Sequence, residues 1–403
     1  MKEKSKHMNI PKIRFKGFED TWKNDKIGNI GSVLMCKRIF KSQTTSIGDI
    51  PFYKIGTFGS TADAFISENL FNEYKTRFSY PQYGDILLSA AGTIGRIVEY
   101  KGEKAYFQDS NIVWVKVNGK IKNQFLKYIY SCIKWNGLEG STIKRLYNNN
   151  ILETAINYPS PEEQQKIASY FQSLDSLIQI TSKKLASLKQ IKAASLQSMF
   201  PREGETVPKV RFKGFEERWL LMKINDVCKQ STSRLSENSL GPNAGNYAVY
   251  GANGYLQNIT TYDYDCPYIG IIKDGSGAGR SRLYPKYSSI IGTMQYIIPK
   301  ETINIEFLAY LFETINFTKF IIGSSIPHIY YKNYCENIVP IPSYNEQQKI
   351  GAYFRNLDRQ ISLQTQRLEK LTYIIHSGFI SGYQNRYGDN LKPPTNVYHR
   401  MTA

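Results

Sequence analysis

The chain has 403 residues, a net charge of +18 and an apolar fraction of 41%. This size and composition exclude an intrinsically disordered polymer and are typical of two to three globular domains. No run of about 18 apolar residues and no CxxC pair occurs, and the start lacks the apolar core of a signal peptide. We therefore expect a cytoplasmic protein with reduced thiols, no membrane span and no metal site.

A twelve-residue opening segment occurs twice. Residues 11–22 read PKIRFKGFEDTW and residues 208–219 read PKVRFKGFEERW, with nine of twelve positions identical. The two copies lie 197 positions apart, from Pro11 to Pro208. A repeat of this quality predicts an internal duplication, so that the molecule has a pseudo-two-fold symmetry.

Each opening segment is followed by a loop-rich block with α+β character. Short runs rich in β-branched and aromatic residues, bounded by turn residues, predict strands. The clearest are Ile86–Leu88, Ile112–Val117, Tyr268–Ile272 and Met294–Ile298. Outside a Gly-Arg loop that reads AAGTIGR at 90–96 and DGSGAGR at 274–280, the two blocks share few residues.

A long helix is predicted after each block. Ser160, Pro161 and Glu163 form a capping-box pattern, and the same pattern returns at Ser343. The helix motif EQQKIASYF at 163–171 recurs as EQQKIGAYF at 346–354, an offset of 183. The second copy is therefore 14 residues shorter than the first between its opening segment and its helix.

Both helices carry an apolar seam with alternating four- and three-residue spacing. This heptad pattern predicts that two helices of about 35 residues, each about 50 Å long, pair as a coiled coil. For the fold as a whole, α+β with an internal repeat, we expect this pair to be antiparallel. Thr181 and Gln364 occupy equivalent polar positions on the seams, which favours one register. The alternative is that each helix packs separately on its own domain. The apolar seam residues are Ile167, Phe171, Leu174, Ile178, Leu185, Leu188, Ile350, Phe354, Leu357, Ile361, Leu368 and Leu371.

These patterns divide the chain into five parts. They are a first block (1–157), a first long helix (158–200), a second block (201–341), a second long helix (342–382) and a C-terminal tail (383–403).

Motifs for catalysis are lacking. The sequence has no phosphate-binding GxxxxGK[ST] loop and no HExxH, and its four histidines form no ligand cluster. A nuclease-like trace, Asp63 with Glu73 and Lys75, has no counterpart in the second copy. We therefore expect a chain that has no catalytic residues and binds no cofactor.

The charge distribution predicts binding to a polyanion. Residues 1–157 carry 24 Lys and Arg against 14 Asp and Glu, whereas residues 201–341 carry 15 against 13. If both blocks bind a phosphate backbone, the first should depend more on charge. An inert basic surface is the alternative.

Polar residues on predicted turns are candidates for contact with DNA. Arginine can read guanine and asparagine can read adenine in the major groove, and glycine permits close approach of the backbone. A plain turn with solvated side chains remains the alternative for each of them. The candidates are Gly92, Gly95, Arg96, Lys144, Arg145, Tyr250, Asn253, Lys273, Gly279, Arg280, Arg282 and His328.

The combination of two opening segments, two dissimilar blocks and two EQQKI-x-x-YF-x-x-LD helices resembles the specificity subunit of type I restriction–modification enzymes. The resemblance covers about residues 9–382. It implies that each block is a target recognition domain for one half of a split double-stranded DNA site. It also implies that the paired helices set the distance between the half-sites and dock two methyltransferase (modification) subunits.

The same resemblance places the chemistry on other chains. The methyltransferase subunits would carry S-adenosylmethionine, and motor-endonuclease (restriction) subunits would use ATP and magnesium. Two further classes of function stay open from the residues alone: a structural adaptor with an incidental basic surface, and a stand-alone nuclease or methyltransferase.

Overall fold

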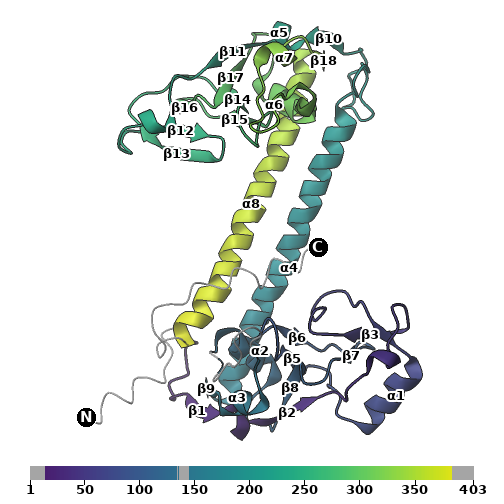
Figure 1. The fold of residues 1–403 in the computed structure, drawn as a ribbon. Coiled ribbons are helices and arrows are strands. Elements are labelled where there is room, and N and C mark those ends of the chain that lie inside the picture. The colour runs from purple at the N-terminus through teal and green to yellow at the C-terminus, as the bar shows by residue number, and fades with distance from the viewer. Residues whose placement is uncertain (1–13, 134, 136–144, 384–403) are drawn as a thin grey trace. The chain divides into compact units, whose positions relative to one another are not determined.

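The computed structural model describes residues 14–133, 135 and 145–383, with side chains up to residue 375 (Figure 1). The chain forms two compact units. Unit 1 contains the residues up to Ser182 and those from Arg367 onward, and unit 2 contains Lys183–Gln366. Each unit thus combines one block with parts of both long helices, and each has the expected α+β composition.

Unit 1 is built on a four-stranded antiparallel sheet with the strand order β2-β8-β5-β6. A second sheet has the order β4-β3-β7, in which β3 and β7 are parallel, and β1 pairs with β9. The strands are β1 (Lys23–Lys26), β2 (Gly31–Met35), β3 (Ile50–Tyr53), β4 (Phe65–Ile66), β5 (Ile86–Ser89), β6 (Ile97–Glu99), β7 (Tyr106–Phe107), β8 (Ile112–Val117) and β9 (Ala155–Tyr158).

Three short helices complete the first block. In α1, Ser67 caps the first turn by accepting a hydrogen bond from the Leu70 amide. In α2, Phe125, Leu126 and Ile129 lie on one face and are buried, as expected of an amphipathic helix on a sheet. The helices are α1 (Glu68–Arg77), α2 (Asn123–Cys132) and α3 (Asn148–Glu153), and single 3₁₀ turns lie at Ile27–Asn29 and Lys41–Gln43.

The four-stranded sheet of unit 1 is buried on both faces. Along β8, Val113 and Val115 join the core under α2, whereas Ile112 and Trp114 join the core shared with the three-stranded sheet. This alternation follows from the two-residue period of a strand. The continuous apolar run of β8 is therefore explained by two cores rather than one.

Unit 2 repeats this topology. Its sheets have the orders β11-β17-β14-β15 and β13-β12-β16, and β10 pairs with β18. The strands are β10 (Leu220–Lys223), β11 (Cys228–Thr232), β12 (Tyr247–Gly251), β13 (Gly254–Ile259), β14 (Tyr268–Ile272), β15 (Ser281–Tyr284), β16 (Ser288–Ile290), β17 (Met294–Pro299) and β18 (Ile338–Ile341). The helices are α5 (Ile224–Val227), α6 (Ile305–Thr314) and α7 (Tyr331–Tyr334), with 3₁₀ turns at Glu237–Ser239 and Phe317–Phe320.

The two blocks are equivalent in topology and register despite their few shared residues. In unit 1 Phe52 pairs with Tyr106, and in unit 2 Val249 pairs with Ser289. Phe52 and Val249 are 197 positions apart in the sequence, whereas Tyr106 and Ser289 are 183 positions apart. The 14-residue difference therefore lies between β3 and β5, where unit 1 contains α1 and unit 2 has only the β12–β13 hairpin.

The long helices, α4 (Pro161–Met199) and α8 (Tyr344–Tyr383), begin one residue after Ser160 and Ser343, as the sequence predicts. In unit 1, the first turns of α4 share a core with Leu371, Ile374 and Ile375 near the end of α8. In unit 2, the first turns of α8 share a core with Leu188 and Met199 near the end of α4. Start packs against end in each unit, so the predicted antiparallel pairing is confirmed.

The first half of each seam also packs on its own block. Ile167, Phe171 and Leu174 contribute to the core that contains α2, and the ring centroids of Phe171 and Tyr128 lie 5.2 Å apart. Ile350, Phe354 and Leu357 do the same with α6 in unit 2. Coiled-coil pairing and packing on the block are therefore not alternatives, because one seam serves both. Of the remaining seam residues, Leu185 and Leu188 are buried and Ile178, Ile361, Leu368 and Leu371 are half-buried.

Candidate nucleic-acid interface

The two repeated motifs meet in each unit through a buried ion pair. Arg14 of the opening segment donates from Nε and Nη2 to both carboxylate oxygens of Glu163, at 2.7 Å each. Arg211 makes the same bidentate contact with Glu346, at 2.7 and 2.8 Å. The Glu163 side chain is 0% exposed. The hydrogen bonds to these carboxylates raise the pKa of both arginines above the ordinary value.

The capping box expected at the start of α4 is only half formed. The capping-box pattern predicts that Glu163 reaches back to Ser160, but its carboxylate faces Arg14 instead. The other half of the box is present, since the Glu163 amide donates to Ser160 Oγ at 3.4 Å. A buried carboxylate gains more from a bidentate guanidinium than from one more amide, which explains the choice.

A glutamine next to each glutamate fastens the block to the long helix. The Gln164 side chain accepts from the Lys122 amide at the start of α2 and donates to the carbonyl of Pro159. Gln347 accepts from the Asn304 amide at the start of α6 and donates to the carbonyl of Pro342. We call the opening segment, the first turns of the long helix and the start of α2 or α6 the joint. Both units have the same joint.

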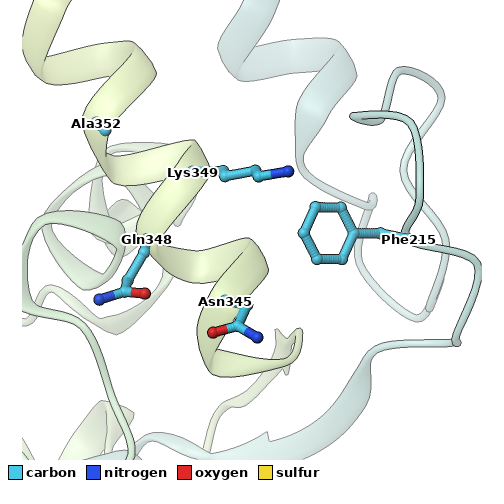
Figure 2. A pocket seen from close by; sticks show the side chains of 5 residues that line it. All are labelled: Phe215, Asn345, Gln348, Lys349 and Ala352. Carbon is cyan, nitrogen blue, oxygen red and sulfur yellow. The ribbon is translucent and has the colours of Figure 1, made fainter.

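The joint also presents an exposed surface. Lys166 lies 5.0 Å from the ring centroid of Phe18, and Lys349 lies 4.8 Å from that of Phe215. In unit 2 this pair borders a cavity of about 440 Å³ (Figure 2). Figure 2 shows the Lys349 side chain extending from α8 toward the Phe215 ring. The cavity is lined by Phe215, Asn345, Gln348, Lys349 and Ala352.

The Gly-Arg loops follow β5 and β14 and close in the same way. Gly95 donates its amide to the Ser89 carbonyl, and Gly279 donates to the Ile272 carbonyl. Both glycines have a φ near +85°, and a Cβ on Gly279 would lie 2.8 Å from Cβ of Phe317. A residue with a side chain would be strained at either position because of the left-handed backbone, and at Gly279 also because of the contact with Phe317. These two glycines thus have a structural role, whatever the loops contact.

The arginines of these loops fold back onto the protein. Arg96 is half-buried, and its Nη1 donates to the Phe58 carbonyl at 2.7 Å. Arg280 is exposed, and its guanidinium lies over Gly277. Arg96 is therefore less available than the sequence suggests, because one of its donors is used by the connection between β3 and β4.

A second segment crosses each Gly-Arg loop. In unit 1, Ala91 forms an antiparallel bridge with Arg145, and in unit 2, Asp274 forms the same bridge with His328. Both partners are shifted by 183 positions. The Leu146 amide donates to the Ala90 carbonyl, as the Ile329 amide does to the Lys273 carbonyl. We call this place the crossing.

The crossing brings together most of the residues that were predicted from the sequence. In unit 1 it gathers Gly92, Gly95, Arg96 and Arg145. In unit 2 it gathers Lys273, Gly279, Arg280 and His328. Lys144 lies outside the described residues.

Three candidates in unit 2 lie away from the crossing. Asn253 is exposed in the tight turn between β12 and β13, next to Gly254 with a φ of +114°. The half-buried Tyr250 ring packs against Tyr284, with centroids 4.9 Å apart. Arg282 is exposed on β15.

Several residues of these sites were not predicted from the sequence. Asp274 is the partner of His328, with Nδ1 and Oδ1 2.8 Å apart, and Asn111 is the partner of Arg145, at 3.0 Å. No local pattern marks either of them. Arg14 and Glu163 do have a signal in the sequence: each repeated motif contains one of the two opposite charges in both copies.

The nuclease-like trace does not form a cluster. Asp63 pairs with Lys54 and Glu73 pairs with Arg77, and these carboxylates are exposed. Among the described residues, no group of three or more His, Cys, Asp or Glu could hold a metal ion. In the same part of the chain, no helix has the length and apolar character to cross a membrane.

Comparison with known proteins agrees with this architecture. The model of the type I restriction modification DNA specificity domain matches residues 19–190 and 216–373, one match in each half of the chain. The chain therefore belongs to this family. A Haemophilus influenzae protein, provisionally named a type I restriction enzyme specificity subunit, is 52% identical over 153 residues. That match covers 38% of this chain and 40% of the relative, so it spans well under half of either.

One solved structure shows the same fold. The S subunit of a type I restriction-modification system from M. genitalium matches with a TM-score of 0.63 and 15% identity, over 95% of this chain and 100% of that one. The HsdS subunit from Thermoanaerobacter tengcongensis matches with a TM-score of 0.42 and 13% identity, over 90% and 97% of the two chains.

Proposed function

We propose that this chain is the sequence-specific DNA-binding subunit of a type I restriction–modification complex, acting in the cytoplasm. Each block reads one half of a bipartite site in double-stranded DNA. The observation that carries the proposal is a duplicated frame with different side chains at its crossing. Two copies of one DNA-binding frame match a DNA site that has two halves. Different side chains at equivalent positions of the frame match two half-sites of different sequence.

The antiparallel pairing of α4 and α8 supports a role in spacing. A coiled-coil helix of about 40 residues is a stiff rod, and such a rod can hold two readers at a fixed distance along a duplex. The seam residues, including the polar Thr181 and Gln364, would keep that distance constant by fixing the register.

The exposed surface of the joint suits a partner that binds twice. Lys166 and Lys349, with Gln165 and Gln348, are exposed and identical in the two copies. Packing does not explain the identity of exposed side chains, whereas two copies of one partner would. We assign this surface to two modification subunits, which would supply S-adenosylmethionine chemistry. Restriction subunits with ATP and magnesium would complete the complex.

Genome-wide mapping of methylated adenine tests this proposal. The chain is co-expressed with its neighbouring modification subunit, and the methylated motif is determined. Exchange of residues 1–157 for the block of another such chain should change one half of the motif only. A motif in which both halves change, or neither, contradicts the modular reading. If the complex folds but directs methylation to no defined motif, a structural adaptor is the better explanation.

A further inference from the structure

The crossing of unit 2 holds a pair of side chains whose role is not explained by packing. His328 Nδ1 lies 2.8 Å from Asp274 Oδ1, and both side chains are about one-third exposed, at 34% and 27%. The imidazole also stacks on Tyr330, with the ring planes 10° apart and the centroids at 6.3 Å. A ring held from two directions has a fixed orientation before any ligand binds.

The equivalent position in unit 1 carries different chemistry on the same backbone. Arg145 occupies the place of His328, and Ala91 occupies the place of Asp274. The Ala90 amide donates to the Asn111 carbonyl, as the Lys273 amide does to the Thr293 carbonyl. Asn111 is therefore the equivalent of Thr293, and in unit 1 its side chain takes over the supporting role by accepting from Arg145 Nη2 at 3.0 Å.

The surroundings of His328 suit a DNA groove. The segment around it exposes apolar side chains that join no core: Ile322 at 51%, Ile326 at 60% and Tyr330 at 41%. Lys332 lies 5.9 Å from the Tyr330 ring centroid and adds a positive charge. Apolar side chains contact thymine methyl groups and lysines contact phosphates, so the segment offers both kinds of contact beside the imidazole.

We propose that Arg145 and His328 are the matched base-reading residues of the two blocks, and that Asp274 is the positioning residue that selects the tautomer of His328. This inference rests on the proposed function. An ionised carboxylate only accepts hydrogen bonds, so the proton of a neutral ring lies on Nδ1 and leaves Nε2 as an acceptor.

The two positions then read different bases. An acceptor in the major groove matches the amino group of adenine or cytosine. The guanidinium of Arg145 donates and matches O6 and N7 of guanine. The first half-site should therefore contain a guanine at this position, and the second half-site an adenine or cytosine.

Exchange of the two constellations tests the inference in the full chain, co-expressed with the modification subunit. The variant D274A/T293N/H328R places the Ala91, Asn111 and Arg145 set into unit 2. Its methylated motif should change at one base pair of one half, which becomes guanine, with a shift in preference of about tenfold. The exposed Lys229→Gln, elsewhere in unit 2, is the control and should leave the motif unchanged.

The reciprocal variant A91D/N111T/R145H should remove the guanine from the other half. It also tests the inference if D274A/T293N/H328R fails to fold. In that case, a first half-site that the reciprocal variant leaves unchanged overturns the inference. Asp274→Asn separates positioning from structure: it should broaden the preference at that one base pair about tenfold while the other half stays unchanged. Equal weakening of both halves would assign Asp274 a merely structural role and overturn its part in the proposal.

The two proposals fail in different ways. A wild-type chain that directs no bipartite motif contradicts the proposed function itself. A bipartite wild-type motif that the triple variants leave unchanged, while still directing methylation, overturns only the assignment of Arg145 and His328.

Discussion

The joint and the crossing lie in the same two blocks, yet they diverged differently between the two copies. At the joint, Arg14 and Glu163 correspond to Arg211 and Glu346, with bond lengths that agree within 0.1 Å. At the crossing, the backbone hydrogen bonds agree but Arg145 is replaced by His328. A buried ion pair tolerates no change of one partner alone, whereas a half-exposed side chain on a fixed frame can change freely.

The same contrast holds for whole segments. Residues 54–85 of unit 1 contain α1, and the equivalent residues 251–268 of unit 2 are 14 positions fewer and have no helix there. The strands on both sides keep their order and register. The longer connection of unit 1 brings its own apolar side chains, since Phe58, Phe71 and Tyr80 are buried in the core with the three-stranded sheet. Lengthening a connection between fixed strands adds little closure entropy, so the insertion is tolerated where it buries its own apolar surface.

The largest effect is expected at the joint. Arg14→Ala leaves the fully buried Glu163 without its cation and should lower the stability of unit 1 by about 4 kcal/mol. Arg211→Ala should do the same in unit 2. Hydrogen exchange with mass spectrometry distinguishes the two, because it follows β9 and β18 separately.

Two controls sharpen this test. The exposed Arg218→Ala should change stability by less than about 0.5 kcal/mol. Glu163→Gln in the Arg14→Ala background should recover part of the loss, since no buried charge then lacks a partner. Equal losses for Arg14→Ala and Arg218→Ala would show that the joint is not held by this pair.

A smaller effect is expected in the Gly-Arg loops. Gly279→Ala combines a left-handed backbone with a clash against Cβ of Phe317, and should cost about 3 kcal/mol. Gly95→Ala meets Trp135 Nε1 at 3.2 Å and should cost about 2 kcal/mol. Gly275→Ala has a φ of +93° but nothing within 4 Å of the new Cβ, so only backbone strain of about 1 kcal/mol remains. Denaturant unfolding measures the loss of stability in each of the three variants. Equal losses in all three would show that the close contacts of the new Cβ atoms do not contribute.

The smallest effect is expected on the seams, where the two copies differ in burial. Thr181 is 3% exposed and Gln364 is half-buried. Thr181→Val should stabilise the chain by about 1 kcal/mol, because a buried hydroxyl is replaced by a methyl group. Gln364→Leu should stabilise it by less, since its amide keeps contact with water. Thermal unfolding measures both, and the opposite order would contradict the burial argument.

Local features were predictable because their causes are local. The helix starts at Ser160 and Ser343 follow from capping residues, and the strands Ile112–Val117 and Tyr268–Ile272 agree with their predicted bounds. The heptad period predicted correctly that α4 and α8 pair, because the period is a local property of each helix. The antiparallel direction, also expected, is seen in the packing of the start of each helix against the end of the other. The seam also packs on α2 and α6, which the period alone does not reveal.

The sequence by itself determined the duplication, the two long helices and the excess of positive charge. Only the tertiary structure decided that Arg14 faces Glu163, 149 positions away, and that Asp274 faces His328, 54 positions away. It also showed that blocks with few shared residues have one topology. The physical reason is that caps and periods act between neighbours along the chain. Ion pairs and sheet order depend on which distant segments the two cores bring together.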